Sequence, residues 1–446
     1  MSESDGAQGA EAGSAYRLLK RLIDVQPAEV RALAWSWIYI FCVLSAYYIL
    51  RPIRDDMGVA GGVENLPWLF TGTLIGMIIV NPPFAALVAR LPRVRFIAIS
   101  YRFFIFNLLI FILFFNVATA EQHIWGGRVF FIWTSVFNLF VVSIFWALMV
   151  DVFDSEQGKR LFGFIAAGAT LGGIAGSSIT ASLAKNVPAA YLLLGSAVLL
   201  EAAVFSVRRL SALSDALRRR PAAQSEKKPI GGGIFSGLTH AFKSPYLINL
   251  SVYMLLFSIT STLLYFQQLE IARQAFADRG ARTAFFARMD LWVNILTLFA
   301  QLFLTARILR SIGVALTLAI LPVLSILGFG ALAMAPTIAV LVAYQVLRRA
   351  GNFAFARPTR EVLFTTVPRE DKYKAKSFID TVVYRTGDQM GAWSYAGLGF
   401  LGLAMTGISI VAVPISIAWL VNALWLGRKQ ERLARAEPAV SAVAAT

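Results

Sequence analysis

The chain has 446 residues, of which 58% are hydrophobic and 15% charged, and its mean hydropathy is +0.67. This composition excludes a water-soluble domain and predicts an all-α integral membrane protein. The one cysteine and two histidines exclude a disulfide framework and a His/Cys metal site, so we expect no metal and no cofactor.

Twelve segments in chain order have roughly the 20 mostly apolar residues that a membrane-spanning helix needs. They are residues 32–50, 67–89, 95–116, 127–151, 161–184, 188–207, 246–268, 286–307, 313–335, 337–356, 376–401 and 404–427. A basic segment with proline and glycine, residues 208–245, follows the sixth. We therefore expect two six-helix bundles, residues 32–207 and 246–427, joined by a cytoplasmic linker.

Most lysines and arginines lie in the tails, the linker and the loops on the side of the termini. Because basic residues concentrate in cytoplasmic loops, both the N-terminal tail, residues 1–31, and the C-terminal tail, residues 428–446, are expected in the cytoplasm. The net charge of +16 is thus explained without nucleic acid. Residues 15–24 are expected to form a short amphipathic helix at the membrane surface, and we see no cleaved signal peptide.

Two local patterns recur in the two halves. LVARLPR follows the second span and LTARILR follows the eighth, while acids followed by bases come after the fourth and the tenth. A six-plus-six repeat is the layout of the major facilitator fold, in which two bundles rock around a site near the membrane midplane.

The glycines of GATLGGIAGSS, residues 168–178, repeat every four residues within an apolar span. Glycines at this spacing let a neighbouring helix backbone approach closely, so we expect a packing face. A phosphate-binding loop needs a preceding strand and a following lysine, and neither is present.

Charged residues inside the spans are informative, because a charge at the bilayer centre costs roughly 2.5–3.5 kcal/mol on insertion scales. They are Arg102, Asp151, Glu201, Arg288, Asp290, Arg348, Arg349, Asp380, Arg385 and Asp388. Glu201 is expected to reach the membrane interface. Asp151 fits a gate or salt bridge as well as it fits a solvated helix end.

The eleventh span carries the clearest polar stripe. At 100° per residue, Asp380, Tyr384 and Gly387 share one face, and Arg385 and Asp388 lie on the adjoining one. Such a stripe is expected to face the bundle interior or a water-filled cavity. It fits either a structural Arg385–Asp388 pair or a substrate pathway.

The stretch YYILRPIRDDMG, residues 47–58, is where the first span meets a run of charges. The loop charges place it on the outer side, so Arg51 and Arg54 are not cytoplasmic anchors. One interpretation is a helix end neutralised by Asp55 and Asp56. The other is that the arginines turn inward at Pro52 to meet an anion.

Three stretches together resemble the ATP/ADP translocase family, which is related to the major facilitator superfamily. They are YYILRPIRDDMGV, FWALMVDVFDSEQGKRLFGFIAAGATLGGIAG and TREVLFTTVPREDKYKAKSFIDTVVYRTGDQMG. Arg51, Arg54 and Asp55 stand at the family's charged positions, Arg54 where a lysine is usual. The other matching positions are Phe145, Trp146, Glu156, Lys159, Arg160, Phe162, Gly163, Arg360, Glu361, Glu370, Lys372, Lys374, Lys376, Ile379, Asp380 and Gly387. Pro52, the arginine at position 54, Tyr384 and Arg385 depart from the usual pattern.

The resemblance implies a secondary antiporter of the bacterial inner membrane for nucleotides or a related phosphorylated anion. Arginine suits phosphate because its guanidinium is planar, permanently charged and bidentate. The chain has no nucleotide-hydrolysing motif, which argues against a primary pump. Expected substrate-binding or gating residues are Arg51, Arg54, Asp55, Arg102, Asp290, Asp380, Arg385 and Asp388. Expected cytoplasmic gate or loop charges are Asp151, Glu156, Lys159, Arg160, Arg360 and Glu361.

Other functions remain open. A general facilitator would couple a metabolite, drug or peptide to protons, with Asp55 or Asp388 titrating. A transporter-like scaffold or sensor would depend on the basic linker and tail. An enzyme is not expected, because no His-based or Ser-based catalytic constellation can be assembled. The expected partners are a small anion and membrane lipid.

Overall fold

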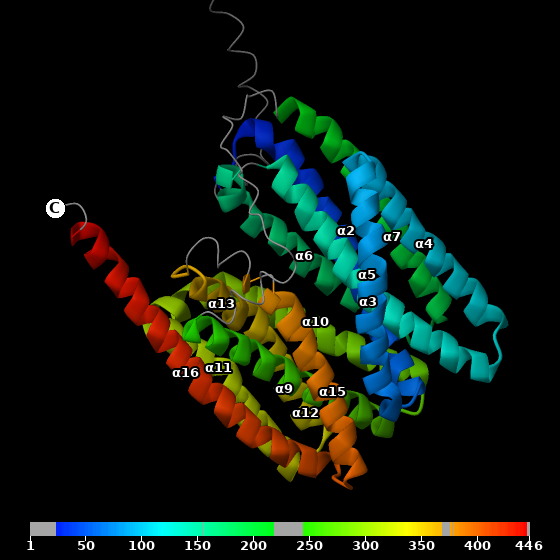
Figure 1. Cartoon of the computed structure of the whole chain (residues 1–446). Coiled ribbons are helices and arrows are strands. Elements are labelled where there is room, and N and C mark those ends of the chain that lie inside the picture. The colour runs from blue at the N-terminus through cyan, green and yellow to red at the C-terminus, as the bar shows by residue number, and fades with distance from the viewer. Residues whose placement is uncertain (1–23, 154, 218–243, 368–374, 377, 444–446) are drawn as a thin grey trace, which may run out of the picture. The chain divides into compact units, whose positions relative to one another are not determined.

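The computed structural model describes residues 24–153, 155–217, 244–367, 375–376 and 378–443 (Figure 1). All regular secondary structure in these residues is helical. Ten of the described helices are long and apolar enough to cross a membrane. The expectation of an all-α membrane protein is thus confirmed, and the count of twelve spans stays a prediction. The amphipathic helix expected at residues 15–24 falls almost wholly outside the described part.

The chain forms two compact units. The first consists of Met1–Arg54, Gly76–Gly126 and Trp133–Lys227, and the second of Asp55–Ile75, Gly127–Ile132 and Lys228–Thr446. The second unit therefore includes short parts of helices that begin or end in the first.

The described residues of the first half form six long helices and two short 3-10 turns. They are η1 (Pro27–Glu29), α2 (Val30–Ala60), η2 (Val63–Asn65), α3 (Leu66–Arg90), α4 (Arg93–Val117), α5 (Ala120–Val152), α6 (Ser155–Leu183) and α7 (Ala189–Leu217). Helix α2 runs ten residues past the expected end at residue 50. The charged stretch at residues 51–57 is thus helix interior, and Pro52 lies within the helix although its ring removes one backbone hydrogen bond.

Helices α6 and α2 pack closely through the glycine face of α6. A Cβ atom at Gly172 would meet the backbone of Phe41, and one at Gly176 would meet that of Ser45. The Ser45 hydroxyl donates to the Gly172 carbonyl at 3.0 Å. The expected packing role of these glycines is confirmed, because no side chain fits where the backbones approach.

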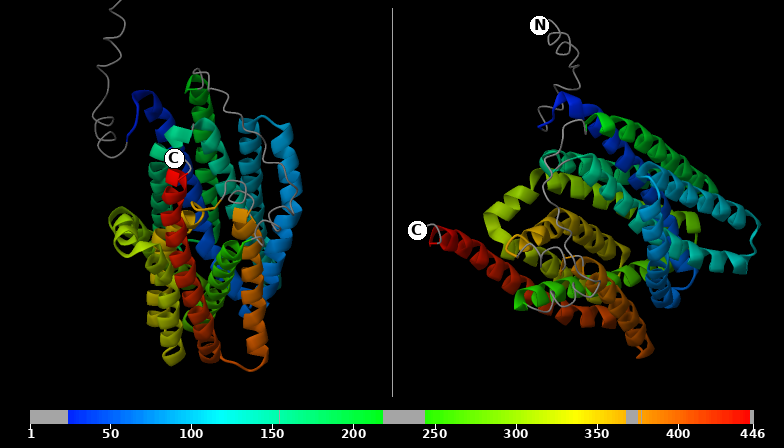
Figure 2. Two further views of the ribbon diagram at one scale, coloured as in Figure 1. Left: turned by 60° about the vertical axis from the view of Figure 1, so that its left-hand side comes forward. Right: turned by 45° about the horizontal axis from the view of Figure 1, so that its top comes forward.

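The second half contains long helices and two π turns. Its elements are α9 (Pro245–Ala275), α10 (Arg279–Phe303), α11 (Thr305–Met334), α12 (Ile338–Gly351), η3 (Asn352–Ala356), α13 (Arg357–Leu363), η4 (Ile379–Val383), α15 (Tyr384–Phe400) and α16 (Met405–Val443). The π turns η3 and η4 interrupt the segments expected as the tenth and eleventh spans. Helices α11 and α16 lie side by side along much of their length (Figure 2).

A break within α11 depends on a glycine and on a carboxylate from α16. Gly313 has φ 76°, a conformation that other residues adopt only with strain. The helix then restarts, and Glu431 accepts from the amides of Val314 and Ala315 at 2.9 and 3.1 Å. An acidic side chain at a helix N-terminus satisfies amides that have no helical partner.

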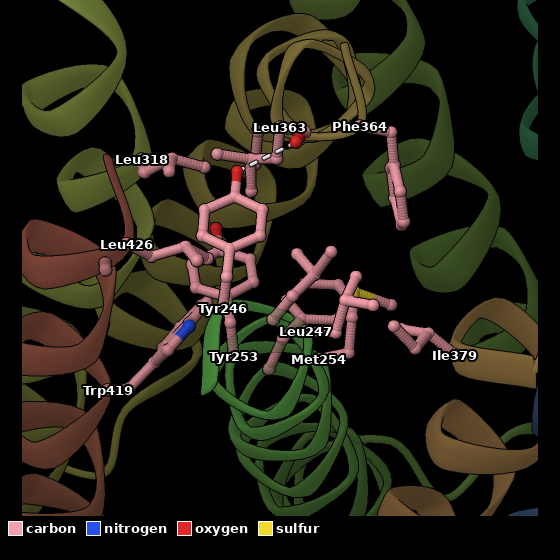
Figure 3. Packing of buried hydrophobic residues seen from close by; sticks show 14 of the residues in the cluster. Tyr246, Leu247, Tyr253, Met254, Leu318, Leu363, Phe364, Ile379, Trp419 and Leu426 are labelled. Atoms are coloured by element: carbon pink, nitrogen blue, oxygen red, sulfur yellow. Dashed lines mark hydrogen bonds between the residues drawn. The ribbon is translucent and has the colours of Figure 1, made fainter. Parts of the chain in front are cut away.

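An apolar cluster joins α9, α11, α13 and α16 in the second unit (Figure 3). Trp419 and Leu318 are fully buried in it. The hydroxyl of Tyr246 donates to the Leu363 carbonyl at 2.8 Å, which satisfies a polar group inside the cluster. This core fixes the helices that carry the polar residues described next.

Candidate functional site

Asp388 is the centre of the polar stripe on α15. Its side chain is 9% exposed, and its Oδ2 pairs with Nη1 of Arg385 at 3.1 Å. The hydroxyl of Ser258 on α9 donates to its Oδ1 at 2.6 Å, and that of Thr262 lies at 3.4 Å. A buried carboxylate needs such partners, so the stripe faces α9. The expected Arg385–Asp388 pair is present.

Two glycines bring α15 against α9. A Cβ atom at Gly387 would meet Ser258 and the Leu255 carbonyl, and one at Gly391 would meet Thr262 and the Ile259 carbonyl. Because the backbones are this close, the short hydroxyl side chains of α9 reach Asp388 directly.

Arg385 is less enclosed than its partner. Its side chain is 32% exposed, and its guanidinium lies 5.7 Å from the centre of the Tyr384 ring. The Arg385 side chain remains partly accessible although it pairs with Asp388. A side chain that binds a transported ligand needs such access.

Arg348 on α12 is a buried cation held by neutral groups. It is 3% exposed and donates to the hydroxyls of Ser325, Ser261 and Thr260 at 2.9–3.1 Å. Its guanidinium also lies 5.8 Å from the Trp419 ring. The hydroxyls and the ring stabilise the charge without cancelling it.

Arg360 on α13 is the third cation near α15. Its Nη1 lies 2.9 Å from Sδ of Met254. The carboxylate of Asp388 and three cations, Arg385, Arg360 and Arg348, lie within electrostatic range of the Tyr384 phenol. Within this set positive charge is in excess, which favours an anion. We name Arg348, Arg360, Tyr384, Arg385 and Asp388 the α15 cluster.

The two π turns lie in the segments that carry this cluster. The turn η3 connects α12, which bears Arg348, to α13, which bears Arg360. The turn η4 contains Asp380, which lies within electrostatic range of Arg360 and Lys376. Such turns are frequent at functional sites because they displace side chains from regular helical positions.

Each of the predicted residues of α2 contacts a different side chain. The guanidinium of Arg51 lies 5.9 Å from the centre of the Tyr48 ring. Nη1 of Arg54 lies 3.5 Å from the Ser135 hydroxyl on α5. Asp55 is 2% exposed and accepts a 2.7 Å hydrogen bond from Tyr265 on α9. Helix α2 continues to Ala60, so these residues lie within the helix, close to its C-terminal end.

Two further predicted residues have partners on neighbouring helices. Asp290 pairs with Arg349 at 2.6 Å, and both are largely buried. Arg102 pairs with Glu201 at 2.6 Å, and each side chain is 49% exposed. The location of Glu201 at the membrane interface stays a prediction, and the neighbouring helix supplies a cation to its carboxylate.

The predicted cytoplasmic charges form local pairs. Asp151 pairs with Arg93, which supports its salt-bridge interpretation, and Glu361 pairs with Lys376. Arg160 pairs with Glu29 at 2.9 Å. The side chains of Glu156 and Lys159 lie outside the described part of the structure, as do Glu370, Lys372 and Lys374.

Sequence reasoning did not assign Arg348, Arg360 and Arg385 to one cluster. Arg348 was noted as an intramembrane charge, and Arg360 was expected in a cytoplasmic loop. The signal available in the sequence was the number of arginines between residues 348 and 385. Periodicity does not show which of them converge, because the π turns change the register of the side chains.

The family model described as TLC ATP/ADP transporter matches residues 115–430. The chain belongs to this transporter family. The match includes the second and third stretches that carry the sequence resemblance, and both the recognition and the assignment to membrane transport are confirmed.

Members of the family in Chlamydia are similar over nearly the whole chain. ADP,ATP carrier protein 2 of Chlamydia pneumoniae is 22% identical, over 97% of this chain and 95% of its own. ADP,ATP carrier protein 1 of Chlamydia trachomatis is also 22% identical, over 92% and 91%.

Solved structures share the fold. A bacterial homologue of the iron transporter ferroportin, in its inward-facing state, has a TM-score of 0.61 at 10% identity, over 88% of this chain and 99% of its own. The nucleoside transporter NupG has a TM-score of 0.53 at 15% identity, over 90% and 98%. This chain therefore shares the overall fold of these transporter structures.

Proposed function

We propose that this protein exchanges ATP and ADP, or closely related phosphorylated anions, across the bacterial inner membrane. Twelve spans in two six-helix bundles, with both termini in the cytoplasm, would alternate access to a site near the membrane midplane. Its curated relatives are named ADP,ATP carrier proteins. The observation that carries the proposal is the excess of positive charge in the α15 cluster.

The cluster suits a phosphate chain for a chemical reason. Three guanidinium groups provide planar, permanently charged donors, and a nucleoside di- or triphosphate carries several negative charges. The Arg385–Asp388 pair holds the partly exposed cation in place when substrate is absent. Substrate phosphate would then compete with Asp388 for Arg385, so that binding energy favours one conformation.

The test is exchange in proteoliposomes loaded with ATP, with labelled ADP added outside. We expect uptake that requires nucleotide inside and does not require a pH gradient. Uptake of ADP that instead needs a proton gradient and no internal nucleotide would support the proton-coupled facilitator. If neither kind of uptake is observed and no phosphorylated anion stabilises the protein against heat, transport of this substrate class is contradicted.

Arg360→Gln tests the charge argument. It should raise the KM for ATP about tenfold and that for AMP much less, because ATP carries more charge to compensate. The control is Arg273→Gln, which removes a cation from an exposed pair with Glu270 on α9 and should leave both values unchanged. Equal effects of Arg360→Gln on ATP and AMP would contradict a phosphate-chain contact.

Arg54→Ala tests the candidate on α2. We expect loss of exchange with normal membrane insertion, because a partly buried cation beside Ser135 suits an anionic substrate. Near-normal exchange would remove Arg54 from the site.

A further inference from the structure

Asp56, near the C-terminal end of α2, is enclosed by two arginines of α10. Its side chain is 3% exposed; Oδ1 lies 2.6 Å from Nε of Arg282 and Oδ2 lies 3.0 Å from Nε of Arg279. Arg282 is 7% exposed and Arg279 is 46% exposed. We name these three residues the Asp56 latch.

The surroundings of the latch strengthen it. Nη1 of Arg282 donates to the Phe276 carbonyl at 3.2 Å, and Nη2 of Arg279 lies 3.1 Å from Sδ of Met57. The neighbouring Asp55 accepts a hydrogen bond from the hydroxyl of Tyr265. An apolar cluster at this end of α2 includes Val59, Val63, Phe131, Phe266 and Phe286. Apolar packing excludes water, which increases the attraction between opposite charges.

Two other contacts connect α3 and α15 within the second unit. Thr71 on α3 donates to the Gln389 side chain on α15 at 3.0 Å. Trp68 lies against Trp393 with ring centres 4.9 Å apart. These contacts are neutral, whereas the latch is ionic, so of the three only the latch contains cations that an anion can bind.

The latch resembles an anion site occupied by the protein's own carboxylate. Each oxygen of Asp56 accepts from a different guanidinium, as two oxygens of a phosphate group can do. We propose that Arg279 and Arg282 form an entry site for the phosphate groups of the transported anion. Asp56 occupies this site while the outer end of the transport pathway is closed. The identity of the anion rests on the proposed function, and the outer location of the site rests on the predicted topology.

Cysteine accessibility tests the latch without transport. Cys42 is replaced by serine, and a reporter is introduced as Val59→Cys, at a side chain that is 4% exposed. The measurement is the rate of reaction with a membrane-impermeant maleimide in vesicles, with and without pyrophosphate. We expect slow labelling that pyrophosphate accelerates several-fold.

Asp56→Asn should accelerate labelling about tenfold without pyrophosphate and tighten pyrophosphate binding, because the arginines lose their internal competitor. Arg279→Gln, at a half-exposed position that is safer for folding, should weaken the response to pyrophosphate at least fivefold. Glu270→Gln, which alters the separate pair with Arg273, is the matched control and should change neither quantity.

Unchanged labelling in Asp56→Asn, or a full response in Arg279→Gln, would overturn the entry site. The result is independent of nucleotide exchange. A protein whose labelling responds as expected but which exchanges no ATP or ADP would contradict the proposed substrate and leave this anion site supported.

Discussion

Two helix crossings in this molecule use the same packing and differ in charge. Helix α6 meets α2 through Gly172 and Gly176, and α15 meets α9 through Gly387 and Gly391. At each crossing a serine donates to a carbonyl of the partner helix: Ser45 to Gly172 at 3.0 Å and Ser258 to Tyr384 at 2.9 Å. The two crossings occupy corresponding positions in the predicted repeat.

The difference lies in what the glycines make room for. At the α6–α2 crossing, the glycines leave room for the backbone of Phe41 and Ser45. At the α15–α9 crossing, the same closeness brings Ser258 and Thr262 to the buried carboxylate of Asp388. Close packing thus serves assembly in one half and the placement of an ion pair in the other.

Overpacking should disrupt both crossings and give the largest effect. Gly172→Leu and Gly391→Leu place a side chain where a Cβ atom already meets backbone, and we expect a cost of about 3 kcal/mol or more. Gly163→Leu on α6 and Gly397→Leu on α15 are matched controls, because a Cβ atom there meets nothing within 4 Å. Thermal unfolding in detergent measures the loss, and equal melting of variants and controls would contradict close packing.

Removing the charge of Arg385 tests whether the α15–α9 crossing has a function in exchange that the α6–α2 crossing does not have. Arg385→Gln is expected to lower kcat/KM for nucleotide exchange about 100-fold, equivalent to about 2.7 kcal/mol. Its folding should be nearly normal, because the side chain is one-third exposed. Exchange by purified variant in proteoliposomes measures this, with size-exclusion behaviour as the folding control. A loss below threefold would show that the ion pair is structural.

The serines offer a finer comparison. Ser45→Ala should cost about 1 kcal/mol of stability and leave exchange within about twofold. Ser258→Ala removes the one hydroxyl donor that the Tyr384 carbonyl and Asp388 share, so we expect about tenfold slower exchange with a similar loss of stability. Equal exchange rates in the two variants would show that the two crossings do not differ in their contribution to exchange.

The smallest effect is expected at Tyr384. Tyr384→Phe keeps the ring near Arg385 and the backbone carbonyl that faces Ser258. Exchange should stay within about twofold of the unaltered protein. A tenfold loss would instead assign the phenol hydroxyl a direct contact with substrate.

Much of this fold could be predicted from the sequence, because hydrophobic length is a strong signal in membranes. The expected positions of the helices agree with the observed ones to within a few residues at most ends. The ends of α2 and α7 each differ by ten residues and that of α16 by sixteen, because charged residues predict that a membrane-spanning helix stops. Arg54 and Asp55 remain helical because α5 and α9 supply partners that no local pattern reveals.

The candidate site was less predictable. The Arg385–Asp388 pair follows from a spacing of three residues within one helix. Arg279 and Arg282 are more than 220 residues from Asp56 in sequence, and Glu201 is 99 residues from Arg102. Pairing between distant helices is a property of tertiary packing, so charge periodicity alone does not show it.

The contact of Glu431 with α11 has a practical consequence. At 1.5 Å per residue, the 39-residue helix α16 is about 58 Å long, well beyond a hydrocarbon core of about 30 Å. The carboxylate near its end caps the restart of another helix. A shortened protein that ends before Glu431 would leave those amides without this acceptor, so a purification tag belongs after this residue and not in its place.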